Sequence, residues 1–387
     1  MTRYHIACVA VSLAASIWLV HGSTIAHKFS ETHWEDNIFF QHNEAEVTSA
    51  LECLKPNVLL PGLYRPLSTT CYFYVGRHLF QNSAEGYHGI NLFLILVNGL
   101  LVYLIAQCFL PRRWSILAAL LFVTRLAHSE VLTNTVEFQV LSSVFFSLLA
   151  ILFFLRFDDD HWPPSRIAGC LALLLCAILC KETAIVVPMI LATYLFCVRK
   201  SDNLKTYLFL IGLPILWAGT YLGFYKSYIS SSPTGFGYNV SPAHLLTQSA
   251  GHFFDFSNLL IWDQKYAPFS ENVRNLIQHP ATLTFFALML LAATGLLLAS
   301  IKWKDTSHHA IRLFIFSFCA WLIATGPFLI LQDRLFMRYS YFGHAWLSIF
   351  WVVALRLVIQ YTRKRFRPQA DGSSHEIDHH ATGHTTV

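Results

Sequence analysis

The sequence predicts an all-α polytopic membrane protein, a bundle of about ten transmembrane helices with two long outward loops. Of the 387 residues, 55% are hydrophobic and only 13% are charged, which is too apolar a composition for a water-soluble domain. Apolar segments of roughly 17–22 residues recur along the chain, the length that a helix needs to cross about 30 Å of hydrocarbon. Residues 1–361 are therefore expected to form one transmembrane domain.

The expected spans alternate with turns and with the two long loops. The spans at 114–127 and 167–181 are short, so we expect them to end at polar groups buried against protein rather than in lipid. The first span also has features of a secretory signal, with Arg3 before an apolar core, but its length favours a retained helix. The full set is 5–25, 89–109, 114–127, 138–156, 167–181, 183–198, 206–226, 281–300, 311–331 and 341–361.

The orientation is predicted from Lys and Arg, which accumulate in the short cytoplasmic loops of membrane proteins. On that basis both termini are cytoplasmic, residues 27–88 and 227–280 face outward, and residues 362–387 form a polar, disordered cytoplasmic tail. The net charge of +5 reflects this bias, and no stripe of basic and aromatic residues suggests nucleic acid as a partner. The orienting residues are Arg3, Arg112, Arg113, Arg199, Lys200, Lys205, Lys302, Lys304, Arg312, Arg363, Lys364, Arg365 and Arg367.

Three further features of the loops and the tail have two interpretations each. The apolar residues between 242 and 262 predict a helix that lies on the membrane and covers the site, or equally one that only packs. Cys53 and Cys71 lie in the first outward loop, where an oxidising compartment would permit a disulfide that their spacing alone does not establish. The tail histidines favour a solvated segment over a metal site; they are His375, His379, His380 and His384.

The first outward loop begins with an acidic stretch, ETHWEDNIFF at 31–40. It places Glu35 and Asp36 just past the expected first span, beside Glu31 and His33. An acidic pair at the edge of a bilayer is either a solvated turn or a reaction centre.

Charged and aromatic residues gather in the later outward turns as well, and each cluster has a structural alternative. Arg65 in PGLYRPLSTTCYFY (61–74) would bind lipid headgroups, and His88 in GYH (86–88) would cap a helix or bond to a neighbouring helix. Lys181 and Glu182 in CKETAIVVP (180–188) would neutralise each other. The remaining turns are TRLAHSEVLTNTVEFQ (124–139), which holds Arg125, His128, Glu130 and Glu137, and LQDRLFMRYSYFGH (331–344), which holds Asp333, Arg334, Arg338, Tyr339, Tyr341 and His344.

Taken together, these turns place carboxylates, cations and aromatics at one face and one depth, which favours a site for an anionic lipid-linked substrate. For a sugar carried on a polyprenyl phosphate, the leaving group is already a stable anion and needs no general acid. It needs cations to hold the departing charge and one carboxylate to take the proton of the acceptor hydroxyl. Hydrolysis of a glycoside would instead require a second carboxyl group to protonate the leaving oxygen.

The order of these motifs resembles the C-type (GT-C) glycosyltransferases, and most of all the protein O-mannosyltransferase-like group with its bacterial relatives that use polyprenyl-phosphate sugars. The resemblance covers most of residues 1–361 and is strongest in 29–106 and 181–188. It implies a GT-C-like helix bundle whose first outward loop supplies the base, Asp36 or less favourably Glu35. It further implies that Arg65, Lys181, Arg338 and Tyr339 bind the donor phosphate, and that Tyr64, His88, His128, Glu130 and Glu182 are further site candidates.

The expected function is therefore a membrane glycosyltransferase that moves a hexose or pentose from a polyprenyl-phosphate donor to a glycan, lipid or protein acceptor. The expected place is the outer face of a cell membrane, such as a bacterial inner membrane, with membrane lipids as further partners. No cofactor is predicted, and nothing in the sequence supports a divalent metal. The alternative is a transporter or flippase of a lipid-linked glycan precursor, which would place charges and broken helices near the bilayer midplane.

The sequence also departs from the family pattern. Glu35-Asp36 stands where relatives often have two aspartates, and His128-Ser129 stands where His-Pro is common. Many relatives carry a large soluble C-terminal domain, whereas this sequence ends in a polar tail. These departures leave open which carboxylate is the base and what the acceptor is.

Overall fold

The computed structural model describes residues 3–26, 47, 49–55, 64–81, 83–156, 164–199, 240–255, 309–329 and 337–365, with isolated residues between 206 and 219 and at 284. Within these residues all regular secondary structure is helical and there is no strand. Six of the described helical segments are long and apolar enough to cross a membrane, namely 4–26, 84–107, 135–156, 182–199, 309–329 and 341–360. The predicted all-α polytopic membrane protein is confirmed.

Most of the expected spans coincide with helices of the structure. The helices are α1 (Arg3–His21), α4 (Ala84–Gln107), α5 (Arg112–Val123), α7 (Phe138–Arg156), α8 (Pro164–Cys180), α9 (Val187–Tyr194) with the π-helical turn η5 (Leu195–Arg199), α14 (His309–Leu329) and α15 (Tyr341–Arg365). The expected spans at 206–226 and 281–300 lie almost wholly outside the described residues. The same is true of the acidic stretch at 31–40 and of most of the tail.

The two short spans end as predicted, at polar side chains enclosed by protein. Beyond α5, Arg125 is 3% exposed and His128 is fully buried, and beyond α8, Lys181 is 5% exposed. Because hydrocarbon offers no hydrogen-bond partner, such residues require a protein environment at that depth. The short helices therefore mark the end of the bundle at which polar groups are buried.

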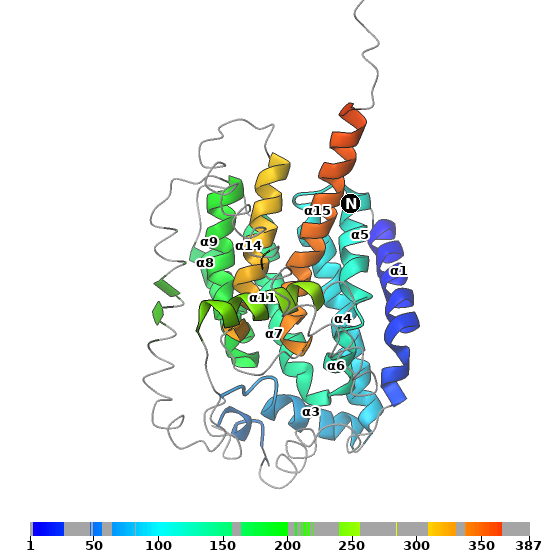
Figure 1. Ribbon diagram of the computed structural model, residues 1–387. Coiled ribbons are helices and arrows are strands. Elements are labelled where there is room, and N and C mark those ends of the chain that lie inside the picture. Colours follow the sequence, from blue (N-terminus) through cyan, green and yellow to red (C-terminus); the bar gives the residue numbers. More distant parts are fainter. Residues whose placement is uncertain are drawn as a thin grey trace, which may run out of the picture.

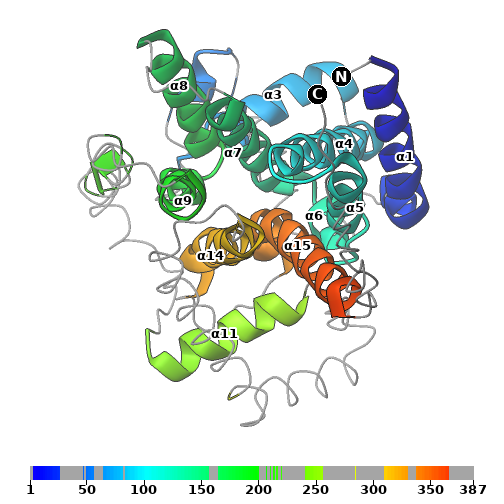
Figure 2. The same cartoon turned by 90° about the horizontal axis from the view of Figure 1, so that it is seen from above.

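The helices form a bundle whose two ends differ (Figure 1). The start of α1 and the end of α15 lie at one end, as expected if both termini face the same side. The short helices α3 (Thr70–Phe80) and α6 (His128–Thr133) lie at the opposite end. Seen from above, α14 and α15 lie side by side and α11 (Pro242–Asp255) lies along one side of the pair (Figure 2).

Close packing between the spans depends on small residues at the contacts. Gly99 of α4 faces Val123 of α5, and a Cβ there would lie 2.4 Å from the Val123 side chain. Gly343 of α15 faces Thr325 of α14, where a Cβ would lie 2.6 Å from the threonine methyl. Membrane helices associate through such close backbone approach, because lipid supplies little hydrophobic drive between them.

α11 confirms the predicted helix in the second long loop as far as Asp255. Phe253 packs against Trp321, with ring centroids 5.3 Å apart, and against Phe350 of α15, at 6.2 Å. His252 and the Ser340 hydroxyl are 2.5 Å apart, so the helix also reaches the turn η8 (Met337–Ser340). α11 thus packs on the bundle and contacts the segment that carries Tyr339.

Candidate functional site at one end of the bundle

The candidate site is built where three chain segments meet at the α3 and α6 end of the bundle. Tyr64 and Arg65 precede α3, Lys181 and Glu182 join α8 to the 3-10 turn η4 (Glu182–Val186), and Tyr339 lies in η8. These segments are far apart in sequence but meet in space, since Arg65 binds Glu182 and Lys181 lies over Tyr339. Proximity of this set was what the motifs predicted.

Arg65 is bound through a forked contact to Glu182. Its Nε donates to one carboxylate oxygen of Glu182 at 2.7 Å, and its Nη2 donates to the other oxygen. Nη1 donates to the side-chain carbonyl of Gln139 at 2.5 Å. The Arg65 side chain is 12% exposed and the Glu182 side chain 28%, so solvent screens the pair only in part. The pair ties residues 64–69, the strap that precedes α3, to the turn after α8.

The same strap has a second anchor beside this ion pair. The Ser68 hydroxyl donates to the backbone carbonyl of Cys180 at 2.5 Å, at the end of α8. The Tyr64 hydroxyl donates to the carbonyl of Leu54 at 3.0 Å. Tyr64 therefore bonds to the preceding turn of the chain and Arg65 faces the bundle.

Lys181 is the buried cation of the site. Its ammonium lies 5.6 Å from the ring centroid of Tyr339 and 6.0 Å from that of Phe328, within the range of a cation–π contact. The two rings are stacked, with centroids 4.5 Å apart and planes 7° from parallel. Pro327, one residue before Phe328, has no N–H to donate within α14, and the helix ends two residues later at Leu329.

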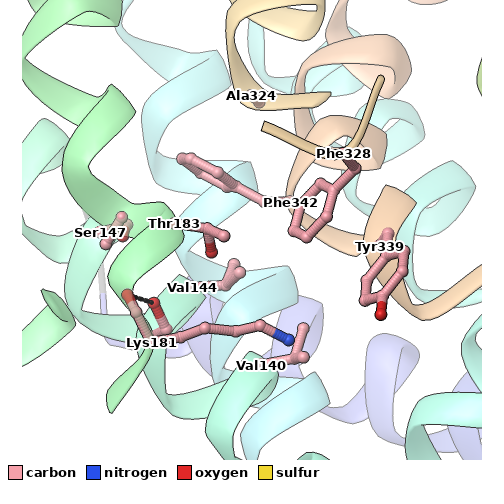
Figure 3. A pocket seen from close by; sticks show the side chains of 11 residues that line it. Val140, Val144, Ser147, Lys181, Thr183, Ala324, Phe328, Tyr339 and Phe342 are labelled. Atoms are coloured by element: carbon pink, nitrogen blue, oxygen red, sulfur yellow. Dashed lines mark hydrogen bonds between the residues drawn. The ribbon is translucent and has the colours of Figure 1, made fainter. Parts of the chain in front are cut away.

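Lys181 also lines a small pocket between α7, α14, η4 and η8. Its side chain extends across the pocket toward Val140 and toward the side on which Tyr339 lies (Figure 3). Besides Lys181, the polar residues of the lining are Ser143, Ser147, Thr183 and Tyr339, each of which carries a hydroxyl group. The other lining residues are apolar. The full lining is Val140, Ser143, Val144, Ser147, Lys181, Thr183, Ala184, Ala324, Phe328, Tyr339 and Phe342. A cation at the edge of an apolar pocket suits an amphipathic anion.

A second polar cluster lies where α6 meets α15. His128 Nε2 and His344 Nδ1 are 3.2 Å apart, so one ring nitrogen donates to the other. The His128 ring also packs edge-on against Tyr341, with centroids 4.5 Å apart. Burial holds the pKa of His128 well below its usual range, and the neighbouring His344, His21 and Arg125 lower it further. His128 is therefore a neutral hydrogen-bonding group and does not add positive charge.

Two other predicted residues of this end, His88 and Glu130, do not line the pocket. His88 Nδ1 is 2.9 Å from the carbonyl of Leu132, and Asn91 donates to the carbonyl of Asn134 at 3.3 Å. These bonds fasten α4 to the turn around α6, which is the helix-to-helix role that the sequence left open. Glu130 is half-buried on α6.

Several predicted residues remain untested by this geometry. Glu35 and Asp36 lie outside the described residues, as does the side chain of Arg338, although η8 carries its backbone. Among the described residues, no three His, Cys, Asp or Glu side chains are grouped to hold a metal.

Two residues of the site were not among the sequence candidates. Gln139, which binds Arg65, ends the polar stretch 124–139, but it carries no charge that would single it out in the sequence. Phe328, which stacks on Tyr339, lies inside an apolar span, where no sequence signal separates it from the other phenylalanines.

The fold and this site define a multi-pass helical membrane protein with a cation-containing pocket at one end of its bundle. The chain is similar to several protein O-mannosyl-transferases. It is 40% identical to Tmtc1 of Drosophila melanogaster over 102 residues, which are 26% of this chain and 12% of that protein. It is 33% identical to human TMTC3 over 136 residues, covering 34% and 14%.

A longer but weaker similarity extends over more of the chain. The chain is 25% identical to tmtc2 of Xenopus laevis over 278 residues, which are 62% of this chain and 32% of that protein. The matched segments thus span about a third or less of these relatives. No family model matches the chain, and no solved structure matches it. The similarities support a relation to this group of membrane glycosyltransferases.

Proposed function

We propose that the protein is a membrane glycosyltransferase that transfers a sugar from a polyprenyl-phosphate donor to a hydroxyl acceptor at the outer face of the membrane. The observation that carries this proposal is Lys181, a buried ammonium at the edge of an apolar pocket, beside the stacked rings of Phe328 and Tyr339. The similarity to protein O-mannosyl-transferases supports the reaction class, with mannose as the first sugar to test.

The pocket offers a polar part for the phosphate of the donor and an apolar part for its isoprenoid chain. The Lys181 ammonium would hold the phosphate, with Arg338 and Tyr339 of η8 completing the contact. The apolar wall formed by Val140, Val144 and Phe342 would accept the first isoprenoid units. The burial of Lys181 strengthens its attraction to a phosphate, because little water screens the charge there.

Arg65 supports this site through Glu182. In the structure both of its forked contacts go to that carboxylate, so it fixes the turn that carries Lys181. Its direct contact with the donor phosphate remains a prediction. A guanidinium can bind a carboxylate and a phosphate through different N–H groups, since it has five donors.

The chemical step follows from the leaving group. Attack of the acceptor oxygen on the anomeric carbon forms the new glycosidic bond and releases polyprenyl phosphate. Asp36, or else Glu35, would take the acceptor proton, and Lys181 would stabilise the phosphate as the bond to it breaks. No group has to protonate the leaving oxygen.

The proposal is tested with the purified full chain in lipid nanodiscs, given polyprenyl-phosphate mannose and a mixture of hydroxyl-bearing peptides and glycans. Release of polyprenyl phosphate together with a mannosylated product is expected, and it should fall strongly in Lys181→Met. Lys55→Met is the matched control, because Lys55 is exposed and forms an ion pair with Glu52, three residues earlier in the chain. Movement of an intact lipid-linked glycan across the vesicle membrane, without release of polyprenyl phosphate, would support the transporter alternative and contradict the proposed transferase activity.

A further inference from the structure

Cys53 and Cys71 lie on two neighbouring elements at the site end of the bundle. Cys53 lies in the 3-10 turn η2 (Glu52–Leu54), which packs against α3, and Cys71 lies in the first turn of α3. Both thiols are free in the structure, and the Cys53 thiol is near enough to Cys71 to affect its ionisation. Cys53 is 1% exposed, and burial raises the pKa of Cys71 to about 12, with a further contribution from the Cys53 thiol.

The surrounding hydrogen bonds hold this pair of thiols in place. On one side of Cys53, the carbonyl of Val47 accepts from Arg77 of α3 at 3.0 Å. On the other side, the carbonyl of Leu54 accepts from Tyr64 at 3.0 Å. The segment around Cys53 is thus held by α3 on one side and by Tyr64, which precedes α3, on the other. A disulfide requires the Cα atoms of its two cysteines to lie within about 7 Å of each other, which the packing of η2 on α3 permits.

We propose that Cys53 and Cys71 form a disulfide in the mature protein. Two S–H bonds break and one S–S bond forms, while two electrons and two protons pass to the disulfide of a thiol–disulfide oxidoreductase, which becomes a dithiol. This exchange requires an oxidising compartment, and the Lys and Arg distribution places residues 27–88 on the outward side where one is found.

The cross-link would close a loop that contains the strap residues of the candidate site. Arg65 and Ser68 lie within this loop, and both contact the α8 end of the bundle. The disulfide would therefore limit how far the strap can move from Glu182 and Cys180. This inference does not depend on the proposed function.

The full chain, solubilised from membranes without reductant, tests the pair directly. Free thiols are first blocked with N-ethylmaleimide in denaturant, the protein is then reduced, and new thiols are labelled with a polyethylene-glycol maleimide. Two labels are expected in the wild type and in Cys180→Ser, and none in Cys53→Ser or Cys71→Ser. Cys180 is the informative control because it is the other cysteine near Cys71.

A second measurement needs no variant. Mass spectrometry of an unreduced digest of the wild type should find the peptides of Cys53 and Cys71 joined, and reduction should separate them. A wild type that takes up no label after reduction overturns the proposal. So does a pair of labels that survives in Cys53→Ser but is lost in Cys180→Ser.

Discussion

The two sides of the polar end of the bundle use similar residues in different physical states. On the α8 side, Arg65 and Glu182 form a forked ion pair that is partly exposed, and Lys181 opens onto a pocket. On the α6 side, His128 and His344 are fully buried, bonded to each other and packed against Tyr341. The first side keeps its charges within reach of a ligand, whereas the second keeps its imidazoles neutral.

This difference indicates a division of tasks between the two sides. Charge next to a cavity can interact with a substrate phosphate, since a ligand can replace part of the lost hydration. A neutral histidine pair enclosed by aromatic rings holds helices in register but adds no attraction for an anion. Substitution of Lys181 on the α8 side should therefore change donor use, and substitution of His128 on the α6 side should change stability.

The largest effect on the transfer rate is expected at the predicted base, which belongs to neither of these two sides. Asp36→Asn keeps the size of the side chain but removes the proton acceptor, so the transfer rate should fall by roughly 10²–10⁴-fold while donor binding remains. Glu35→Gln should have a smaller effect if Glu35 only orients Asp36. Turnover and donor binding measured on the purified variants check this. A solvated turn at 31–40 would instead leave both variants near the wild-type rate.

The next largest effect is expected for Lys181→Met on the α8 side, as a loss of donor affinity. Loss of a charged hydrogen bond of about 1.5–3 kcal/mol would weaken donor binding by about 10- to 100-fold, and methionine preserves the length of the side chain. The measurement is the dissociation constant for polyprenyl-phosphate mannose, with Lys55→Met as control. Undiminished affinity would remove Lys181 from the donor site and end the contrast between the two sides.

The ion pair on the α8 side is expected to give an intermediate effect on stability. Arg65→Ala leaves Glu182 without its forked partner, and Glu182→Ala leaves Arg65 without its own, so each should cost about 1–3 kcal/mol. The double variant should cost less than the sum, because the interaction is lost only once. Denaturation of the three variants in detergent gives this coupling. Additive costs would show that the contact contributes little.

The span positions could be predicted from sequence because hydropathy along a membrane helix is a local property. α4, α7, α14 and α15 each lie within a few residues of the expected span. The gathering of Arg65, Lys181 and Tyr339 at one end also followed, since alternating helices return every second turn to the same side. The hydrogen-bond and ion-pair partners of these residues could not be predicted from the sequence, because they depend on distances between helices. A pairing of Glu182 with Lys181 is one of two interpretations of the sequence, whereas in the structure Glu182 binds Arg65. His88 holds α4 to the turn around α6.

The smallest effect is expected on the α6 side and depends on pH. Burial depresses the pKa of His128 in the folded protein below that of an exposed histidine, near 6.5, so the unfolded chain binds the proton more readily. The contribution of neutral His128 to the free energy of unfolding is therefore fully present above about pH 6.5, and it is lost as the pH falls below that value. Among the described residues, the titratable groups that face His128 are His344, His21, Arg125 and Tyr341, and none of these is a carboxylate.

The melting temperature of the detergent-solubilised protein should therefore drop between pH 7.5 and pH 5.5, and His128→Asn should reduce this drop. His78→Asn is the matched control, because His78 is an exposed histidine on α3. It should follow the wild type at every pH. Donor binding at pH 7.5 should change little in His128→Asn, since a neutral imidazole adds no charge to the pocket. An unchanged pH slope in His128→Asn would contradict the neutral buried state, and a large loss of donor affinity would place His128 with Lys181.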